Sequence, residues 1–202
     1  METDIQKYLA ILSVSVLYFI SALIVLINPS DSILFTIIRL GGIVGLLSLG
    51  LSVIIIPYAA QLYKLFGKPF LKIHHLFAAL GIILLTLHPI ALLIITLNPL
   101  IFVPAIDSFI SFWALAGRPA LILIYIGVFA ALLRNKLENS WRKIHWLLYI
   151  AYIFGYIHGI LIGTDFKNPF ILIMFTIFTI LIAITFIIKR MQMRKMKQKR
   201  SE

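Results

Sequence analysis

The residues of this 202-residue chain best suited to chemistry are its histidines, which occupy matched positions in two apolar segments. The tripeptide Lys-Ile-His that ends at His74 recurs in the second segment, where it ends at His145. His88 follows His74 by 14 residues and His158 follows His145 by 13, which is about 21 and 20 Å of helix at 1.5 Å per residue. Two helices that run in the same direction would therefore form two pairs: His74 with His145, and His88 with His158.

Paired imidazoles that face each other favour the axial positions of a six-coordinate haem iron. Zinc instead needs three or four ligands around one point, and the two pairs are some 20 Å apart along the helices. A zinc site built from His74, His75 and His145 is the alternative, but it leaves the other two histidines without a role. We therefore predict two b-type haems with metal ligands on two helices: His74 and His145 for the inner haem, His88 and His158 for the outer one.

The rotation per residue bears on which histidines share a helix face. Fourteen residues at about 100° each fall roughly 40° short of four turns, so His74 and His88 lie on one face. Thirteen residues put the two histidines of the second segment on different faces, unless Gly155 or a π-bulge makes that helix irregular. The same argument favours His74 over His75 as the ligand. His75 would then hydrogen-bond a haem propionate or line the cytoplasmic access route.

The segments that must position these histidines have the composition of membrane spans. Hydrophobic residues make up 62% of the chain and charged residues 12%, against roughly 45–50% and 25% in soluble domains. Apolar runs of at least about 18 residues recur, each long enough to cross a bilayer. This excludes a soluble enzyme, a secreted disulfide scaffold and a nucleic-acid binder. We predict an all-α, polytopic six-helix bundle with the haems between the third and fifth spans, the spans being residues 7–27, 33–60, 73–97, 113–133, 144–162 and 170–188.

Two of these spans have features of their own. The first begins without a basic n-region and lacks an A-x-A cleavage site, so we expect a retained helix instead of a signal peptide. The fourth is interrupted by Gly-Arg-Pro at residues 117–119, and proline is best tolerated in the first turn of a helix. A shorter helix from Pro119, with residues 113–116 as an outer-face segment, is therefore the alternative.

The basic residues predict the orientation of the bundle. With the N-terminus in the cytoplasm, all but Arg39, Arg118 and Lys167 of the 18 basic residues lie on the cytoplasmic side, as the positive-inside rule requires. Both termini are then cytoplasmic, with a transmembrane domain over residues 1–190 and a basic tail, residues 191–202, against anionic lipid. Arg39 and Arg118 lie at outer span ends, where we predict contacts with haem propionates; the alternative is that they reach lipid headgroups.

Several cofactor classes have no residues to hold them. The chain has no cysteine, which excludes disulfides, thiolate metal sites and iron–sulfur clusters. It contains no G-x-G-x-x-G strand–helix motif and no phosphate loop. The nucleotide-binding module of any reductant is therefore not in this chain.

The two histidine segments, residues 74–89 and 140–159, resemble the ferric reductase-like transmembrane family, and the likeness covers about residues 5–190. The run Ser-Trp-Arg-Lys-Ile-His that ends at His145 and the Gly-Arg-Pro motif are most similar to the haem subunit of bacterial methionine sulfoxide reductases (MsrQ/YedZ). His74-His75 departs from that branch, which carries basic residues there. The flavin and nicotinamide domain of the ferric reductase and NADPH oxidase branches is not in the chain.

The residues and this resemblance together predict a haem b electron-transfer subunit of an oxidoreductase. The donor would be a separate flavoprotein or a quinol, so that flavin or quinone enters through a partner. The acceptor would be ferric iron, oxygen or a partner reductase outside the membrane. One alternative is a transporter or channel that relays protons through the histidines, which predicts acidic residues at mid-membrane; the spans have none. A membrane metallohydrolase is the other alternative, and the chain lacks an H-E-x-x-H motif.

Overall fold

A computed structural model describes residues 2–28, 30 and 32–198, and these residues are 88% helical with no strand among them. The elements in chain order are α1 (Glu2–Ile27), α2 (Ile33–Ile54), η1 (Ile56–Tyr58), α3 (Ala59–Phe66), α4 (Phe70–Thr96), η2 (Pro99–Phe102), α5 (Phe109–Ala114), α6 (Gly117–Leu132), α7 (Arg134–Leu137), α8 (Ser140–His145), α9 (Leu147–Ile162), η3 (Thr164–Lys167) and α10 (Pro169–Gln198). Pro29, Asp31 and residues 199–202 of the predicted tail lie outside the described residues. The predicted all-α class is confirmed for the part described.

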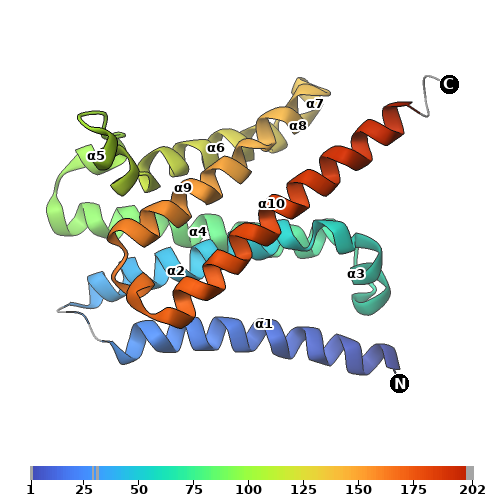
Figure 1. Cartoon of the computed structure of the whole chain (residues 1–202), viewed down its shortest axis with the longest axis horizontal. Helices are drawn as coiled ribbons and strands as arrows, with labels where there is room; N and C mark the ends of the chain where they lie inside the picture. Colours follow the sequence, from blue (N-terminus) through green and yellow to red (C-terminus); the bar gives the residue numbers. More distant parts are fainter. Residues whose placement is uncertain (1, 29, 31, 199–202) are drawn as a thin grey trace.

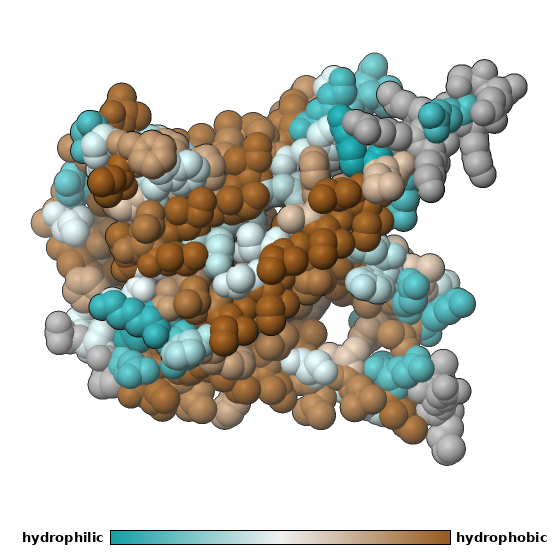
Figure 2. All heavy atoms as spheres, viewed as in Figure 1, coloured by the Kyte–Doolittle hydropathy of each residue, from teal (hydrophilic) through white to brown (hydrophobic). Residues whose placement is uncertain are grey.

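Five stretches are long and apolar enough to cross a bilayer: α1, α2, α4, the α8–α9 stretch Ser140–Ile162, and α10. Their side chains form a broad hydrophobic surface, with polar residues gathered mainly toward the ends (Figure 2). These helices identify a membrane protein in contact with lipid. The remaining apolar helix, α6, has 16 residues, or about 24 Å of rise, which is shorter than the hydrocarbon core of roughly 30 Å.

The long helices run up and down, so that α3, α7 and both described chain ends lie at one end of the bundle (Figure 1). We call this the basic end, because its loops and helix termini carry Lys64, Lys68, Lys72, Arg134, Lys136, Arg142, Lys143, Lys189 and Arg190. The far end carries η2, α5 and η3. The helices α4 and α9 both run from the basic end to the far end, as the matched histidine segments predicted.

Two predicted spans end or divide at proline- and glycine-containing segments. The second ends at Ile54, before Pro57, and the chain continues as η1 and the short helix α3. Gly67 closes α3 in the left-handed conformation, with φ 62°, which glycine adopts without steric cost. The fourth span is divided: α5 ends at Ala114 and α6 begins at Gly117. The shorter helix that the Gly-Arg-Pro motif suggested is therefore present.

The fifth span is interrupted at Trp146, between α8 and α9. The helix is continuous through Gly155, so the irregularity expected at Gly155 or as a π-bulge lies directly after His145 instead. The Trp146 ring packs between α10 side chains, 6.2 Å from the Phe186 ring centre and 4.4 Å from the Arg190 guanidinium.

The helices pack as two antiparallel hairpins, α2 with α4 and α6 with α9. Close approach in the first hairpin depends on glycine: a Cβ at Gly81 would lie 2.9 Å from the Leu49 nitrogen and 3.1 Å from the Gly45 oxygen. The buried core lies where α2 and α9 meet α1 and α10, and it includes Leu47, Leu49, Tyr152 and Phe175. A hydrogen bond between Thr86 and Tyr125 (2.8 Å) connects α4 to α6 and thus one hairpin to the other.

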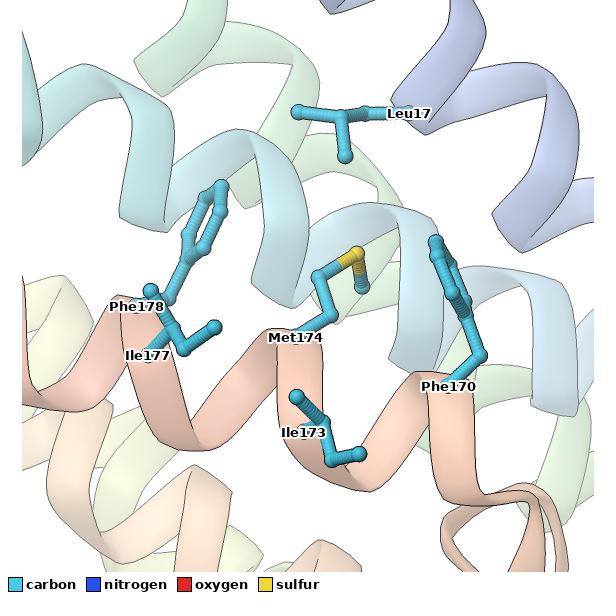
Figure 3. A pocket seen from close by; sticks show the side chains of 6 residues that line it. All are labelled: Leu17, Phe170, Ile173, Met174, Ile177 and Phe178. Atoms are coloured by element: carbon cyan, nitrogen blue, oxygen red, sulfur yellow. The ribbon is translucent and has the colours of Figure 1, made fainter.

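A groove of about 300 Å³ lies between α1 and α10 (Figure 3). Every side chain that lines it is apolar: Leu17, Phe170, Ile173, Met174, Ile177 and Phe178. A groove without polar groups on the membrane-facing side of a bundle suits lipid acyl chains. It offers no group that could bind or transform a polar substrate.

Candidate functional site

The histidines predicted to pair at the far end lie face to edge across the two hairpins. The ring centres of His88 on α4 and His158 on α9 are 6.3 Å apart, and the ring planes are at 89°. Imidazoles that share one metal ion through bonds of about 2 Å have ring centres about 6 Å apart. The ring separation is therefore compatible with both imidazoles binding one metal ion.

The histidines predicted to pair at the basic end have an electrostatic interaction but no recorded ring contact. His74 lies in the first turns of α4, and His145 is the last residue of α8. Phe70 and Trp141 lie one turn before them, with ring centres 5.6 Å from His74 and 5.9 Å from His145. Of the two predicted pairs, the structure thus brings the far-end rings into contact, and the basic-end pairing stays a prediction.

Each of the four paired histidines is fixed by one hydrogen bond from Nδ1 to a backbone carbonyl of the neighbouring helix. The acceptors are Ser52 for His74 (2.9 Å), Ile38 for His88 (2.7 Å), Gly127 for His145 (3.0 Å) and Ala114 for His158 (2.7 Å). A carbonyl oxygen can only accept, so Nδ1 must carry the proton in every case. The unprotonated Nε2 is then free to bind a metal, and a ligand ring that donates its other nitrogen to a carbonyl is the usual arrangement in metal sites.

The carbonyl acceptors repeat the spacing of the histidines they hold. Ile38 and Ser52 on α2 are 14 residues apart, as are the two histidines of α4. Ala114 and Gly127 are 13 residues apart, as are the histidines at 145 and 158. In the α2–α4 hairpin the two helices have the same rise per residue, so equal spacing gives a similar geometry at both ends. In the second set Ala114 lies on α5 and His145 on α8, so the acceptors and histidines come from four elements.

Glycine backbone packs closely against the far-end histidines. A Cβ at Gly117 would lie 2.9 Å from Cδ2 and 3.0 Å from Nε2 of His158, so only glycine fits against this ring edge. A Cβ at Gly42 would lie 3.3 Å from Nδ1 of His88. At the basic end, an apolar groove of about 460 Å³ runs along α6 and reaches Ile144, the residue before His145.

Zinc coordination is not supported by the arrangement of the ligands. Within residues 2–28, 30 and 32–198, no three His, Asp or Glu side chains cluster as a metal site would require. The zinc alternative of His74, His75 and His145 therefore lacks a formed site. Two histidines per metal suit a haem iron, to which the protein supplies only the axial ligands.

No protein-family model matches the sequence, and no curated protein or solved structure is significantly similar to it. The resemblance to the ferric reductase-like family therefore rests on the sequence motifs described above.

The two arginines predicted to contact propionates have different surroundings. Arg39 makes a two-pronged ion pair with Asp165, with Nε to Oδ2 at 3.0 Å and Nη2 to Oδ1 at 2.5 Å, and its Nη1 donates to the Asn28 carbonyl. Its guanidinium nitrogens thus have protein partners, which gives it a role other than the predicted one. Arg118 lies within electrostatic range of His158 and donates to the Val103 carbonyl at 2.9 Å. Its predicted propionate contact remains compatible with this position.

The structure also separates the two adjacent histidines on α4. The His75 side chain is exposed, and its recorded contact is with the ring of His74, 5.8 Å away. His74 is half-buried and fixed to α2. This difference favours His74 as the ligand, in line with the prediction.

Two kinds of site residue could not be identified from the sequence. The four carbonyl acceptors are backbone atoms, so their residue types carry no signal. Asp165 is visible as a polar residue after the fifth span, but its partner Arg39 is 126 positions away.

One buried polar group lies outside the histidine sites. Tyr152 on α9 is fully buried, next to Gly50 of α2. Its hydroxyl has no hydrogen-bond partner among the described residues.

Proposed function

We propose that this protein is a haem b electron-transfer subunit of the ferric reductase-like kind, with two bis-histidine sites across the membrane. The observation that carries the proposal is the set of four histidines, each with Nδ1 bonded to a carbonyl and Nε2 left free. The 6.3 Å separation of the His88 and His158 rings supports it. Haem supplies reversible one-electron chemistry when bound, and the protein supplies ligands, orientation and a low-dielectric setting.

The residues of the chain have distinct tasks in this proposal. Nε2 of His74 and His145 would hold one haem, and Nε2 of His88 and His158 would hold the other. The carbonyls of α2, α5 and α6 accept from the four imidazoles and so fix their ring planes. Arg118 offers a cation near the far-end site for a propionate.

The topology of the proposal follows the charge distribution. The basic end is placed in the cytoplasm, since exposed lysine and arginine favour the cytoplasmic side, and α6 is counted as a sixth, short span. Electrons then enter from a flavoprotein or a quinol at the basic end and leave at the far end for an external acceptor or partner reductase. The cell membrane is the proposed location.

A reduced-minus-oxidised absorption spectrum tests the cofactor. The detergent-purified chain, expressed with ample haem, is expected to show sharp low-spin b-type bands after dithionite reduction, at about two haems per chain, because each bis-histidine site is closed by strong-field ligands on both faces. A flat spectrum from folded protein would refute the proposal and return the histidines to proton transfer, the alternative class. Binding of one haem per chain would refute the two-site form.

Vesicles test transfer of electrons across the membrane. The purified protein is placed in liposomes that contain dithionite, with ferricyanide outside. We expect haem-dependent reduction of the ferricyanide, since two sites about 20 Å apart along the helices divide the membrane into short steps. Liposomes with the His88→Ala variant serve as the control and should fall to the leak rate of empty liposomes. Equal rates with and without His88 would contradict transfer through both sites.

A further inference from the structure

The Arg39–Asp165 ion pair connects α2, whose Ile38 carbonyl accepts the His88 hydrogen bond, to η3, the turn that follows α9 and its His158. Its side chains are 15% and 6% exposed. Arg39 also donates to the Asn28 carbonyl, at the end of α1. The pair thus joins α1, α2 and the connection between α9 and α10 at one point.

On the α2 side, the pair lies next to the anchor of His88. Arg39 directly follows Ile38, whose carbonyl accepts the His88 Nδ1–H bond at 2.7 Å. The bidentate contact fixes the guanidinium in both distance and plane. A shift of Arg39 would therefore move the carbonyl that orients the His88 ring.

On the other side, the pair supports the helix segment that carries His158. Asp165 is followed by Phe166, which is 7% exposed. The Phe166 ring lies against Gly159, where a Cβ would collide with it, and 6.2 Å from the Tyr156 ring. Gly159 is the residue after His158, so η3 supports the end of α9 where the ligand lies.

We propose that Arg39 and Asp165 are a positioning pair for the far-end haem site. The pair sets the register of α2 against the end of α9, and so places the two imidazoles at the separation seen between His88 and His158. This inference rests on the proposed function, and it assigns Arg39 to Asp165 instead of to a propionate. The basic-end site lies at the other end of the bundle from Arg39 and Asp165, so it serves as an internal control.

The test measures haem content and spectra of full-length variants in detergent. Asp165→Asn and Arg39→Gln are each expected to lose most of the far-end haem while the basic-end haem stays, because loss of a group that orients a metal ligand typically weakens binding about 10–100-fold. The spectrum of the His88→Ala variant serves as the reference for a protein that has lost its far-end haem. Lys167→Gln is the matched control: it removes a neighbouring exposed cation from η3 and should leave both haems in place.

The far-end haem that remains in each variant gives a second readout. Asp165→Asn leaves the arginine charge uncompensated and should raise the reduction potential of that haem, whereas Arg39→Gln leaves the carboxylate and should lower it. A role in stability alone would not give shifts of opposite sign. Unchanged far-end occupancy and potential in both variants would overturn the inference.

A double replacement separates positioning from stability. Replacing both partners of a buried pair with apolar residues is often neutral for stability, so Arg39→Met with Asp165→Leu should fold and keep the basic-end haem. We expect it to lose the far-end haem nonetheless. Retention of both haems in this variant would overturn the positioning role. If the unmodified protein binds no haem at all, the proposed function fails instead, which is a distinct result.

Discussion

Replacement of single histidines with alanine is expected to remove one haem and leave the other, in a pattern that follows the two pairs. His88→Ala and His158→Ala should each lower the content from about two haems to one, with identical residual spectra, because a haem that loses one of two axial imidazoles loses its low-spin state and most of its affinity. His74→Ala and His145→Ala should leave the other haem. Pyridine haemochrome assay and low-temperature spectra measure both quantities.

His75→Ala is the matched control for His74→Ala. The two residues are adjacent, but only His74 is fixed to the Ser52 carbonyl, while His75 is exposed. The His75 variant should therefore keep both haems with low-spin spectra. Equal loss of both haems in every variant would contradict the pairing. Loss of one haem in His75→Ala would show that His75, and not His74, is the ligand.

Gly117→Ala is expected to displace the far-end haem without altering any ligand. The added Cβ would lie 2.9 Å from Cδ2 and 3.0 Å from Nε2 of His158, so the imidazole must turn away from the position where its hydrogen bond to Ala114 holds it. Overpacking of this kind costs about 1–3 kcal/mol, which corresponds to roughly 5- to 150-fold weaker binding. Haem titration of the apoprotein measures the change.

Gly155→Ala supplies the comparison for this variant. Gly155 also lies in an apolar helix, but a Cβ there would meet a Leu46 methyl group at 3.2 Å and no histidine. We expect its far-end haem to bind as in the unmodified protein. If Gly117→Ala binds both haems with unchanged affinity, the imidazole edge at Gly117 does not face the bound group.

The hydrogen bonds also distinguish electron transfer from proton transfer by the same histidines. A relay histidine must accept and release protons at both ring nitrogens, whereas here Nδ1 of all four is committed to a carbonyl. Two carboxylates lie seven residues from a paired histidine along the chain, Glu138 before His145 and Asp165 after His158, and Asp165 is bound to Arg39. The geometry therefore favours a fixed-ligand role for these side chains.

Local sequence features predicted the helices better than their ends. Apolar runs predicted the five long spans, and the Gly-Arg-Pro motif predicted the short helix α6. Both features depend only on residues that are close together in the sequence. The end of α2 at Ile54 and the break at Trp146 were not predicted. Trp146 packs on Phe186 and Arg190 of α10, some 40 residues later, and a contact of that kind leaves no local signal.

The sequence by itself determined the class of the protein and the two levels of the histidines. Hydrophobic length specifies a membrane helix, and residue spacing specifies distance along it, so both can be counted from the chain. Only the tertiary structure decided how the imidazoles are oriented, which of His74 and His75 is fixed, and that Arg39 pairs with Asp165. Those features depend on backbone carbonyls and on residues up to 126 positions apart, and such partners meet only when the helices pack.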